Sequence, residues 1–186
     1  MPGSNRTDTV LFAGSGLNYG EAIRHALSFN RAIASGRDET VGLGGHIQGG
    51  GHGPLSSTFG LTADNIYQVR VITSDGKILV ADATQNQDFL WNFRSGGAGQ
   101  YGIVTQYVIK TYPAPRVTNT GFSVSPAGNS STTIEGSFKA LAALLQGLPS
   151  LMDAGCAGAT IVSGNVKTGV TISQGIDAYD KSLSAV

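Results

Sequence analysis

Residues 41–60 read VGLGGHIQGGGHGPLSSTFG, and glycine occupies eight of these twenty positions. Each glycine costs about 0.5–1 kcal/mol relative to alanine in regular structure, because glycine loses the most backbone freedom on folding. A flexible linker would alternate glycine with serine and would lack residues of the buried type. Here Pro54 follows the densest part, and apolar residues are interspersed or follow directly: Val41, Leu43, Ile47, Leu55, Phe59 and Leu61. The stretch therefore predicts an ordered glycine loop with apolar anchors.

A backbone without side chains can approach a phosphate or a flat ring system closely. The spacing in GLGGHIQGGG is not the G-x-G-x-x-G template of a βα dinucleotide unit. A second cluster, SGGAGQYG at 95–102, leads directly into a predicted strand. Two glycine loops that flank one hairpin indicate two walls around one ligand. The alternative is two crowded turns in a β-rich core, and the glycine pattern alone leaves both readings open.

The composition excludes several classes of partner. Lys plus Arg and Asp plus Glu cancel at 12 each in 186 residues, so nothing points to nucleic acid or an anionic membrane. No apolar run approaches the roughly 20 residues of a membrane span. Cys156 is the single cysteine, and the three histidines lack the i, i+4 spacing of a helical zinc pair, so no metal site is expected. No signal peptide is visible, and the compartment is left unassigned.

Up to residue 112 the patterns predict strands alternating with short helices. TVLFA (9–13) predicts a strand, and the apolar stripe from Tyr19 to Ile33 predicts a helix with Gly36 as its C-cap. Residues 66–83 predict a β-hairpin in which Asp75-Gly76 supplies the positive-φ residues of the turn. A short helix at 86–93 follows. The last element is a strand at 102–112, in which Ile103, Thr105, Tyr107 and Ile109 are expected to share one face.

The composition shifts at Pro113 and Pro115, so a domain boundary is expected near 113–116. Beyond it we expect a strand at 117–125, an amphipathic helix at 134–148 that ends at Pro149, and a pair of strands at 157–163 and 168–173. The fold class predicted from these elements is α+β.

The ordered run of motifs in this chain resembles a known family. VGLGGHIQGGGHGPLSSTFGLTADNI, then a hairpin with SDGK, then NQDFLWNFRSGGAGQYGIVTQYVIKTYPAP, is similar to the FAD-linked oxidoreductases of the berberine bridge enzyme-like group. These belong to the vanillyl-alcohol oxidase superfamily, with an FAD-binding domain of the p-cresol methylhydroxylase type. The sequence of these segments resembles fungal members. The matching segments run in order from Thr9 to Pro115.

The resemblance implies FAD as the cofactor and carries over family contacts position by position. The glycine segment would lie along the flavin and its ribityl–pyrophosphate chain. His46 matches the family histidine near the pyrimidine end of the ring, and the alternative is a structural histidine bonded within the loop. Val41 matches a residue over the flavin that influences access of O2, and a valine resembles the oxidase type. The implied contacts are Val41, Gly42, Gly44, Gly45, His46, Gly49, Gly50, Gly51 and Gly53, together with Gly102, Ile103 and Val104 at the adenine end.

Two departures from the family pattern limit what the resemblance implies. Many relatives carry a cysteine that links to the flavin at the position of Asp38, and a carboxylate cannot form that thioether. The family's phosphate-loop half would precede Thr9, and the residues that supply the catalytic base would follow this chain. We therefore expect residues 1–115 to be the C-terminal half of the FAD-binding domain and residues 116–186 to be the truncated start of an α+β substrate domain. No catalytic residue is assigned within the chain.

Two functions follow from the resemblance. The first is an FAD-dependent oxidoreductase that transfers hydride from an alcohol-, sugar- or amine-type small molecule to flavin N5, with O2 as the electron acceptor. The second is a non-catalytic remnant that binds FAD weakly or not at all. Asp64 and Asn65 are typical of the family, but they are expected to act as cap and loop-organising residues rather than in chemistry.

Overall fold

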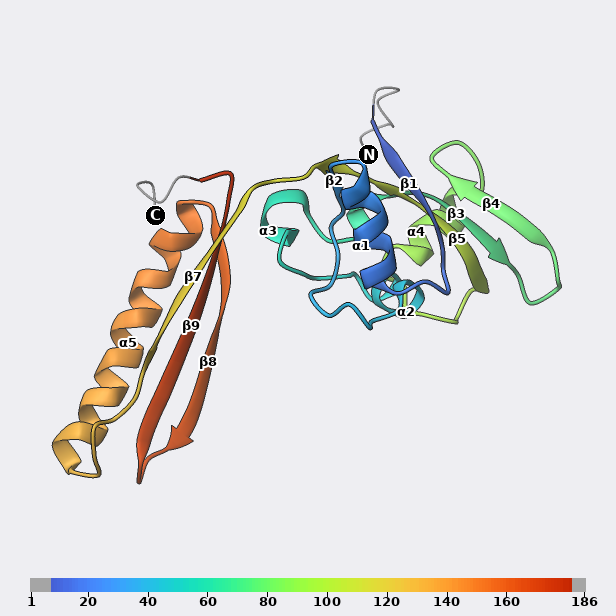
Figure 1. Ribbon diagram of the computed structural model, residues 1–186. Coiled ribbons are helices and arrows are strands. Elements are labelled where there is room, and N and C mark those ends of the chain that lie inside the picture. Colours follow the sequence, from blue (N-terminus) through green and yellow to red (C-terminus); the bar gives the residue numbers. More distant parts are fainter. Residues whose placement is uncertain (1–7, 182–186) are drawn as a thin grey trace. The chain divides into compact units, whose positions relative to one another are not determined.

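The computed structural model describes residues 8–181, which divide into two compact units between Ala114 and Pro115 (Figure 1). Unit 1 is residues Met1–Ala114 and unit 2 is residues Pro115–Val186. Both units combine helices with antiparallel sheets, which confirms the predicted α+β class.

Unit 1 is built on a four-stranded antiparallel sheet in the order β1-β5-β3-β4. Its strands are β1 (Val10–Gly14), β3 (Ile66–Ile72), β4 (Ile78–Asp82) and β5 (Ile103–Lys110). Two short strands, β2 (Arg31–Ala32) and β6 (Tyr112–Pro113), form a second sheet. The helices are α1 (Tyr19–Ser28), α2 (Leu43–Gln48), α3 (Ser56–Phe59), the 3₁₀ helix η1 (Ala63–Asn65) and α4 (Gln87–Phe93).

A buried hydrophobic cluster joins most of these elements. It draws side chains from β1, α1, α2, β3, β4, α4 and β5, so the glycine-rich stretch contributes to the core of the unit. The largest of the fully buried side chains here are Tyr19, Tyr107, Phe93, Leu43, Ile47, Ile66, Leu90 and Ile109. Burying one large apolar side chain contributes roughly 1.5–3 kcal/mol.

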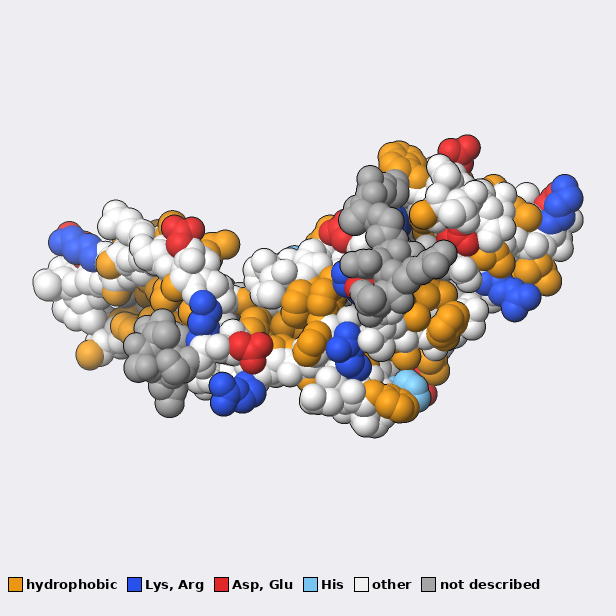
Figure 2. Space-filling view, turned by 90° about the horizontal axis from the view of Figure 1, so that it is seen from above, with side chains coloured by type: hydrophobic (Ala, Val, Ile, Leu, Met, Phe, Trp, Pro, Cys, Tyr) orange, Lys and Arg blue, Asp and Glu red, His pale blue; other side chains and the backbone are white. Residues whose placement is uncertain are grey.

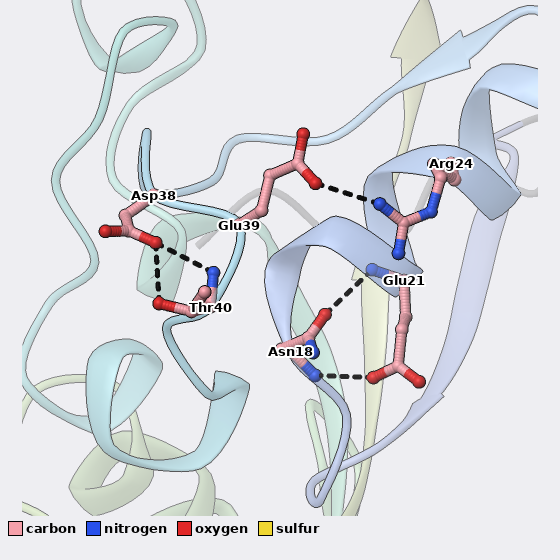
Figure 3. Close-up of polar contacts among 6 residues, drawn as sticks. All are labelled: Asn18, Glu21, Arg24, Asp38, Glu39 and Thr40. Carbon is pink, nitrogen blue, oxygen red and sulfur yellow. Dashed lines mark hydrogen bonds and ion pairs between the residues drawn. The ribbon is translucent and has the colours of Figure 1, made fainter.

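Helix α1 begins as the sequence predicts and ends earlier. Asn18 and Glu21 form a capping box, in which the Asn18 side chain accepts from the Glu21 N–H at 2.9 Å and Glu21 accepts from the Asn18 N–H at 3.0 Å (Figure 3). The predicted continuation to Ile33 and the C-cap at Gly36 are wrong. Asn30 has a φ of 54°, a left-handed conformation that asparagine tolerates and that stops the helix just beyond Ser28.

The hairpin of β3 and β4 is confirmed, but its turn differs from the prediction. Of the two turn residues, only Gly76 has a positive φ, at 79°. The Gly76 N–H donates to the Thr73 carbonyl and the Thr73 N–H donates to the Lys77 carbonyl, each at 2.9 Å. This is a longer loop that contains a left-handed glycine, a common alternative to the two-residue turn.

Strand β5 does not keep one face along its length. The pairing with β3 moves from Arg70↔Gln106 to Val71↔Val104, so Thr105 is an extra residue in a β-bulge. A one-residue slip reverses the two faces of a strand. Ile103 is therefore 70% exposed while Val104 is buried, and the prediction that Ile103 and Thr105 share a face with Tyr107 is wrong.

The segment that joins η1 to the sheet is organised by polar side chains. The Leu61 N–H donates to Asp64 Oδ2 at 2.8 Å, as in a helix cap. Asn65 donates to the carbonyls of Phe59 and Leu61 and accepts from the Tyr112 hydroxyl at 2.6 Å. The expected loop-organising role is thus confirmed for both residues. Asp64 satisfies a backbone donor from within η1, although the N-cap position of η1 is Thr62.

Replacing Asp64 with alanine is expected to lower the free energy of unfolding of unit 1 by about 1 kcal/mol, because the Leu61 N–H loses its acceptor. Asp64→Asn keeps an acceptor oxygen and serves as the control. Urea denaturation followed by the fluorescence of Trp91, the single tryptophan, measures both. Equal midpoints for Asp64→Ala and the unmodified chain would contradict this role of Asp64.

Unit 2 is a three-stranded antiparallel sheet in the order β7-β9-β8, with one helix packed against β8 and β9. Its elements are β7 (Val117–Val124), α5 (Ser131–Asp153), β8 (Cys156–Asn165) and β9 (Gly169–Tyr179), and the last two strands are longer than predicted. Helix α5 runs through Pro149, so the predicted stop there is wrong. Proline lacks an N–H and removes one hydrogen bond, yet the helix resumes with the Ala154 N–H bonded to the Ser150 carbonyl.

The surface carries few charges. In the space-filling view, Lys, Arg, Asp and Glu side chains lie scattered, and hydrophobic side chains reach the surface on both units (Figure 2). The exposed large apolar residues include Phe12, Trp91 and Ile103 in unit 1 and Met152 and Ile161 in unit 2. Among residues 8–181, no helix combines the length and apolar character needed to cross a membrane.

Candidate functional site: the glycine face of α2

The glycine-rich stretch contains a helix that the sequence did not predict. Leu43–Gln48 (LGGHIQ) forms α2, with Gly42 and Gly49 as its caps. Leu43 and Ile47 are fully buried, whereas Val41 just before the helix is 37% exposed. The prediction of an ordered segment is therefore correct, and so is the prediction that Leu43 and Ile47 are apolar anchors. The centre of the segment, however, is a helix and not a loop.

The other side of α2 is a surface of bare backbone, which we call the glycine face: Gly42, Gly45, His46 and Gly49. These positions are spaced i, i+3, i+4 and i+7, so they lie on one side of a helix. The three glycines are exposed. A Cβ built on Gly42 or Gly45 would meet nothing within 4 Å. The chain's own packing thus gives no reason for glycine at Gly45, whereas Gly42 is the N-cap of α2, a position where glycine is favoured over alanine.

Three other glycines of the stretch are required by the fold itself. Gly50 and Gly51 have φ values of 103° and 78°, which other residues rarely adopt. A Cβ on Gly53 would lie 1.7 Å from the Ser35 carbonyl oxygen. Gly44 is intermediate, because a Cβ there would lie 3.5 Å from the Ser15 carbonyl oxygen. The seven predicted contact glycines therefore divide into those that shape the loop and those that leave a surface open.

His46 is tied to the core by a tyrosine of α1. The Tyr19 hydroxyl lies 2.7 Å from His46 Nδ1, and the two rings meet edge to face with centroids 5.0 Å apart. Burial raises the pKa of Tyr19, so the hydroxyl keeps its proton. Gly36 leaves room for the imidazole, since a Cβ on it would lie 3.3 Å from His46 Cε1. His46 is hydrogen-bonded as the structural alternative requires, but its partner lies outside the loop.

The second predicted group of residues lies next to α2. The Gly97 N–H donates to the Gln48 carbonyl at 3.1 Å, which joins the two glycine clusters. Ser15 lies against both α2 and β5: its hydroxyl donates to the Val104 carbonyl at 2.5 Å, and its own carbonyl faces Gly44. The structure therefore brings the start of β5 close to α2.

Within that second group, Gly102 has a structural reason of its own. Its φ is 138°, and a Cβ on it would lie 2.6 Å from the Ile72 carbonyl oxygen. The side chain of Ile103 faces solvent and that of Val104 faces the core. A ligand that met Gly102, Ile103 and Val104 would therefore contact main chain and the Ile103 side chain.

One polar atom under α2 lacks a partner. Gln48 Nε2 donates to the Gly44 carbonyl at 2.9 Å and to the Tyr107 hydroxyl at 3.2 Å. Gln48 Oε1 is buried, and no described residue hydrogen-bonds to it. Burial raises the pKa of Tyr107 to about 12, so that hydroxyl is neutral at physiological pH. These contacts fix the buried side of α2 beneath the glycine face.

The segment before α2 holds Asp38, where the resemblance leads us to expect a cysteine in many relatives. The Asp38 carboxylate accepts from the side chain and the N–H of Thr40, at 2.7 and 2.8 Å, and these bonds lower its pKa (Figure 3). Next to it, Glu39 forms an exposed ion pair with Arg24 at 2.9 Å. Such exposed pairs contribute little to stability. Asp38 therefore organises its own turn.

Sequence reasoning missed the side chains that support the site: Tyr19, Thr62, Ser15 and Gln48. Tyr19 fitted the apolar stripe of a helix, and no local pattern indicated a partner 27 residues away. In the part of the chain that the structure describes, no three His, Cys, Asp or Glu residues gather in a way that could hold a metal ion.

Comparison with known proteins gives consistent matches. A family model described as "FAD binding domain" matches residues 4–82. An FAD-linked oxidoreductase of Neocamarosporium betae is 37% identical over 171 residues, which cover 91% of this chain and 29% of the relative. A VAO-type flavoprotein oxidase of Thermothelomyces thermophilus is 36% identical, over 91% of this chain and 30% of the relative.

Solved structures agree on the fold. A VAO-type flavoprotein from Myceliophthora thermophila matches with a TM-score of 0.81 and 30% identity, over 100% of this chain and 33% of its own. The berberine bridge enzyme of Eschscholzia californica matches with a TM-score of 0.70 over 95% of this chain and 34% of its own, at 22% identity, which supports the fold alone. The chain thus spans about a third of the length of these relatives.

Proposed function

Because this chain belongs to the FAD-linked oxidoreductases of the vanillyl-alcohol oxidase type, a family of FAD enzymes, we propose that the glycine face of α2 is where the chain meets FAD. The observation that carries the proposal is the open space over Gly42 and Gly45. Glycine inside a helix, as at Gly45, costs about 1 kcal/mol relative to alanine, and no contact within the chain explains that cost. A flat ligand lying on the main chain would explain it.

The proposed contacts are the positions that the family resemblance implies. Around α2 they are Val41, Gly42, Gly44, Gly45, His46, Gly49, Gly50, Gly51 and Gly53, and at the adenine end they are Gly102, Ile103 and Val104. Of the glycines, Gly42, Gly45 and Gly49 would touch the cofactor directly. Gly50, Gly51, Gly53 and Gly102 would act by holding the main chain in the required path, since their conformations or close contacts demand glycine.

FAD, when bound, supplies the hydride acceptor for an alcohol-, sugar- or amine-type small-molecule substrate, with O2 as the final electron acceptor. The chain's part is to position that cofactor and to complement its charge. His46 lies on the same face as Gly42, Gly45 and Gly49. A fixed donor at this position would stabilise negative charge that develops on the pyrimidine end of the ring. Val41 would present an uncharged, β-branched side chain beside it and influence access of O2.

We further propose that residues 1–115 are the second half of the FAD-binding domain and residues 116–186 the beginning of a substrate domain. The division of the structure between Ala114 and Pro115 supports this arrangement, and so does the match of the family model to residues 4–82. We assign no catalytic base within the chain.

The test is whether the chain holds FAD. Purified protein is titrated with FAD and its visible absorbance and flavin fluorescence are recorded, then excess cofactor is removed by gel filtration. We expect saturation at one FAD per chain and a flavin band that persists after filtration. Riboflavin, which lacks the pyrophosphate and the adenosine of FAD, is the matched ligand. It is expected to bind more weakly because the proposed contacts of the glycine segment with the pyrophosphate and of Gly102–Val104 with the adenine end are lost.

A colourless protein after filtration, with no saturable change during titration, would contradict FAD binding by this chain. It would instead favour the alternative of a non-catalytic remnant. Equal affinities for FAD and riboflavin would contradict the proposed pyrophosphate and adenine contacts, and would leave the proposed contact with the flavin ring.

A further inference from the structure

Tyr19 and Thr62 form a buried chain of hydroxyl groups behind the glycine face. The Tyr19 hydroxyl lies 2.7 Å from His46 Nδ1 and 3.5 Å from Thr62 Oγ1. Tyr19 and Thr62 are both fully buried, so each hydrogen must find an acceptor within the protein. The assignment of these hydrogens decides which nitrogen of His46 carries the proton.

Thr62 does not give its hydrogen to Tyr19. Thr62 Oγ1 lies 2.9 Å from the Ala34 carbonyl oxygen and 2.9 Å from the Gly51 carbonyl oxygen. Both of these are acceptors only, so the single hydroxyl hydrogen of Thr62 goes to one of them. Thr62 also joins two segments of the chain, because Ala34 lies before α2 and Gly51 lies after it.

Tyr19 therefore keeps one hydrogen and has two candidate acceptors. The contact with His46 Nδ1 has a short hydrogen-bond length, whereas 3.5 Å to Thr62 is at the outer limit. Burial raises the pKa of Tyr19, which keeps the phenol protonated and able to donate. With its hydrogen on the shorter bond, Nδ1 of His46 is an acceptor and carries no proton.

A neutral imidazole carries one proton, so it must then be on Nε2. Nε2 makes no hydrogen bond to any described residue. Among residues 8–181, Gln48 Oε1 is the one buried side-chain oxygen or nitrogen that lacks a hydrogen-bond partner. His46 Nε2 also lacks a partner but does not belong to this buried group, so it is at least partly accessible to solvent.

We propose that Tyr19 is a positioning residue that holds neutral His46 as its Nε2–H tautomer, so that the glycine face presents a fixed N–H donor. The value of that donor rests on the proposed FAD site, where it would meet an oxygen of the bound cofactor. The tautomer itself is a property of the protein without cofactor. Tyr19 does not touch the reacting atoms and acts only through His46.

The test is the long-range ¹H–¹⁵N spectrum of the ¹⁵N-labelled full chain without FAD, at mildly alkaline pH where imidazoles are neutral. His25→Gln and His52→Gln, both at exposed positions, assign the His46 signals. We expect the pattern of a single tautomer, with Nδ1 unprotonated and Nε2 protonated. In Tyr19→Phe the two nitrogen shifts should move toward each other, as in a ring that exchanges between tautomers.

Tyr67→Phe is the matched control. It removes another tyrosine hydroxyl of the same unit, one bonded to Asp8 rather than to any residue of α2, and should leave the His46 shifts unchanged. A protonated Nδ1 in the unmodified chain would overturn the inference by itself, even if Tyr19→Phe did not fold. Unchanged shifts in folded Tyr19→Phe would also overturn it. Failure of FAD to bind would overturn the proposed function and leave this result intact.

Discussion

Gly53→Ala is expected to lower the free energy of unfolding of unit 1 by about 3 kcal/mol or more. The added Cβ would lie 1.7 Å from the Ser35 carbonyl oxygen and 2.7 Å from the Ser35 carbonyl carbon. Both are backbone atoms and cannot rotate away, so the two segments must separate. Overpacking typically costs 1–3 kcal/mol, and this contact is at the severe end, against a total stability of roughly 5–15 kcal/mol.

The damage should extend to the glycine face. Ser35 precedes Gly36, which leaves room for the His46 imidazole. Thr62 is hydrogen-bonded to the carbonyls of Ala34 and Gly51, which lie in the same two segments as Ser35 and Gly53. Moving residues 35 and 53 apart therefore weakens both the packing of Gly36 against His46 and the hydrogen bonds of Thr62.

Urea denaturation followed by Trp91 fluorescence and by circular dichroism measures the loss. Gly14→Ala is the matched control, because a Cβ there meets nothing within 4 Å and no positive φ is involved. Its free energy of unfolding should stay within about 0.5 kcal/mol of the unmodified chain, as surface substitutions usually do. Similar values for Gly53→Ala and Gly14→Ala would show that the two segments do not approach this closely.

The sequence predicted the four strands of the main sheet of unit 1 well because alternation and turn residues are local signals, but it did not predict the short strands β2 and β6. The β3–β4 hairpin and β1 are where the patterns place them. The face of β5 was wrong at Ile103 because one bulged residue, Thr105, reverses the alternation, and no local rule marks a bulge there. Helix ends were wrong for a related reason: Asn30 stops α1 through a left-handed conformation, and Pro149 is tolerated within α5.

Helix α2 was missed because its sequence argues against a helix. Gly44 and Gly45 both have low helix propensity, and the segment is too short for a periodic signal. The buried side chains of Leu43 and Ile47 override that preference by packing in the core. A local sequence that conflicts with its structure often marks a functional site.

Much of the candidate site could be predicted, but only as a set of positions. The glycine pattern could not separate Gly42 and Gly45, which face open space, from Gly51 and Gly53, which the backbone requires. That separation depends on what lies within a few ångströms of each Cα. The Tyr19–His46 hydrogen bond could not be predicted from the sequence for the same reason, because it joins two helices through tertiary packing.

Gly45→Ala is expected to have opposite effects on folding and on cofactor binding. A Cβ at this helical position meets nothing within 4 Å, so alanine should leave unit 1 as stable or up to about 1 kcal/mol more stable. The same methyl group would occupy the space proposed for the flavin. An overpacked contact of 1–3 kcal/mol corresponds to a loss of FAD affinity of about 5- to 150-fold.

Gly136→Ala is the control for the effect of replacing a helical glycine at a position outside the proposed FAD site. Gly136 lies within α5 of unit 2, is exposed, and has nothing within 4 Å of an added Cβ. It should gain helix stability by the same mechanism and bind FAD as the unmodified chain does.

The most direct test of the FAD site is the dissociation constant of FAD for Gly45→Ala, measured by flavin fluorescence beside Gly136→Ala and the unmodified chain. A folded Gly45→Ala protein that binds FAD at least about fivefold more weakly, with Gly136→Ala unchanged, is the result predicted here. If folded Gly45→Ala binds FAD as tightly as the other two proteins, the cofactor does not lie on the bare main chain of α2.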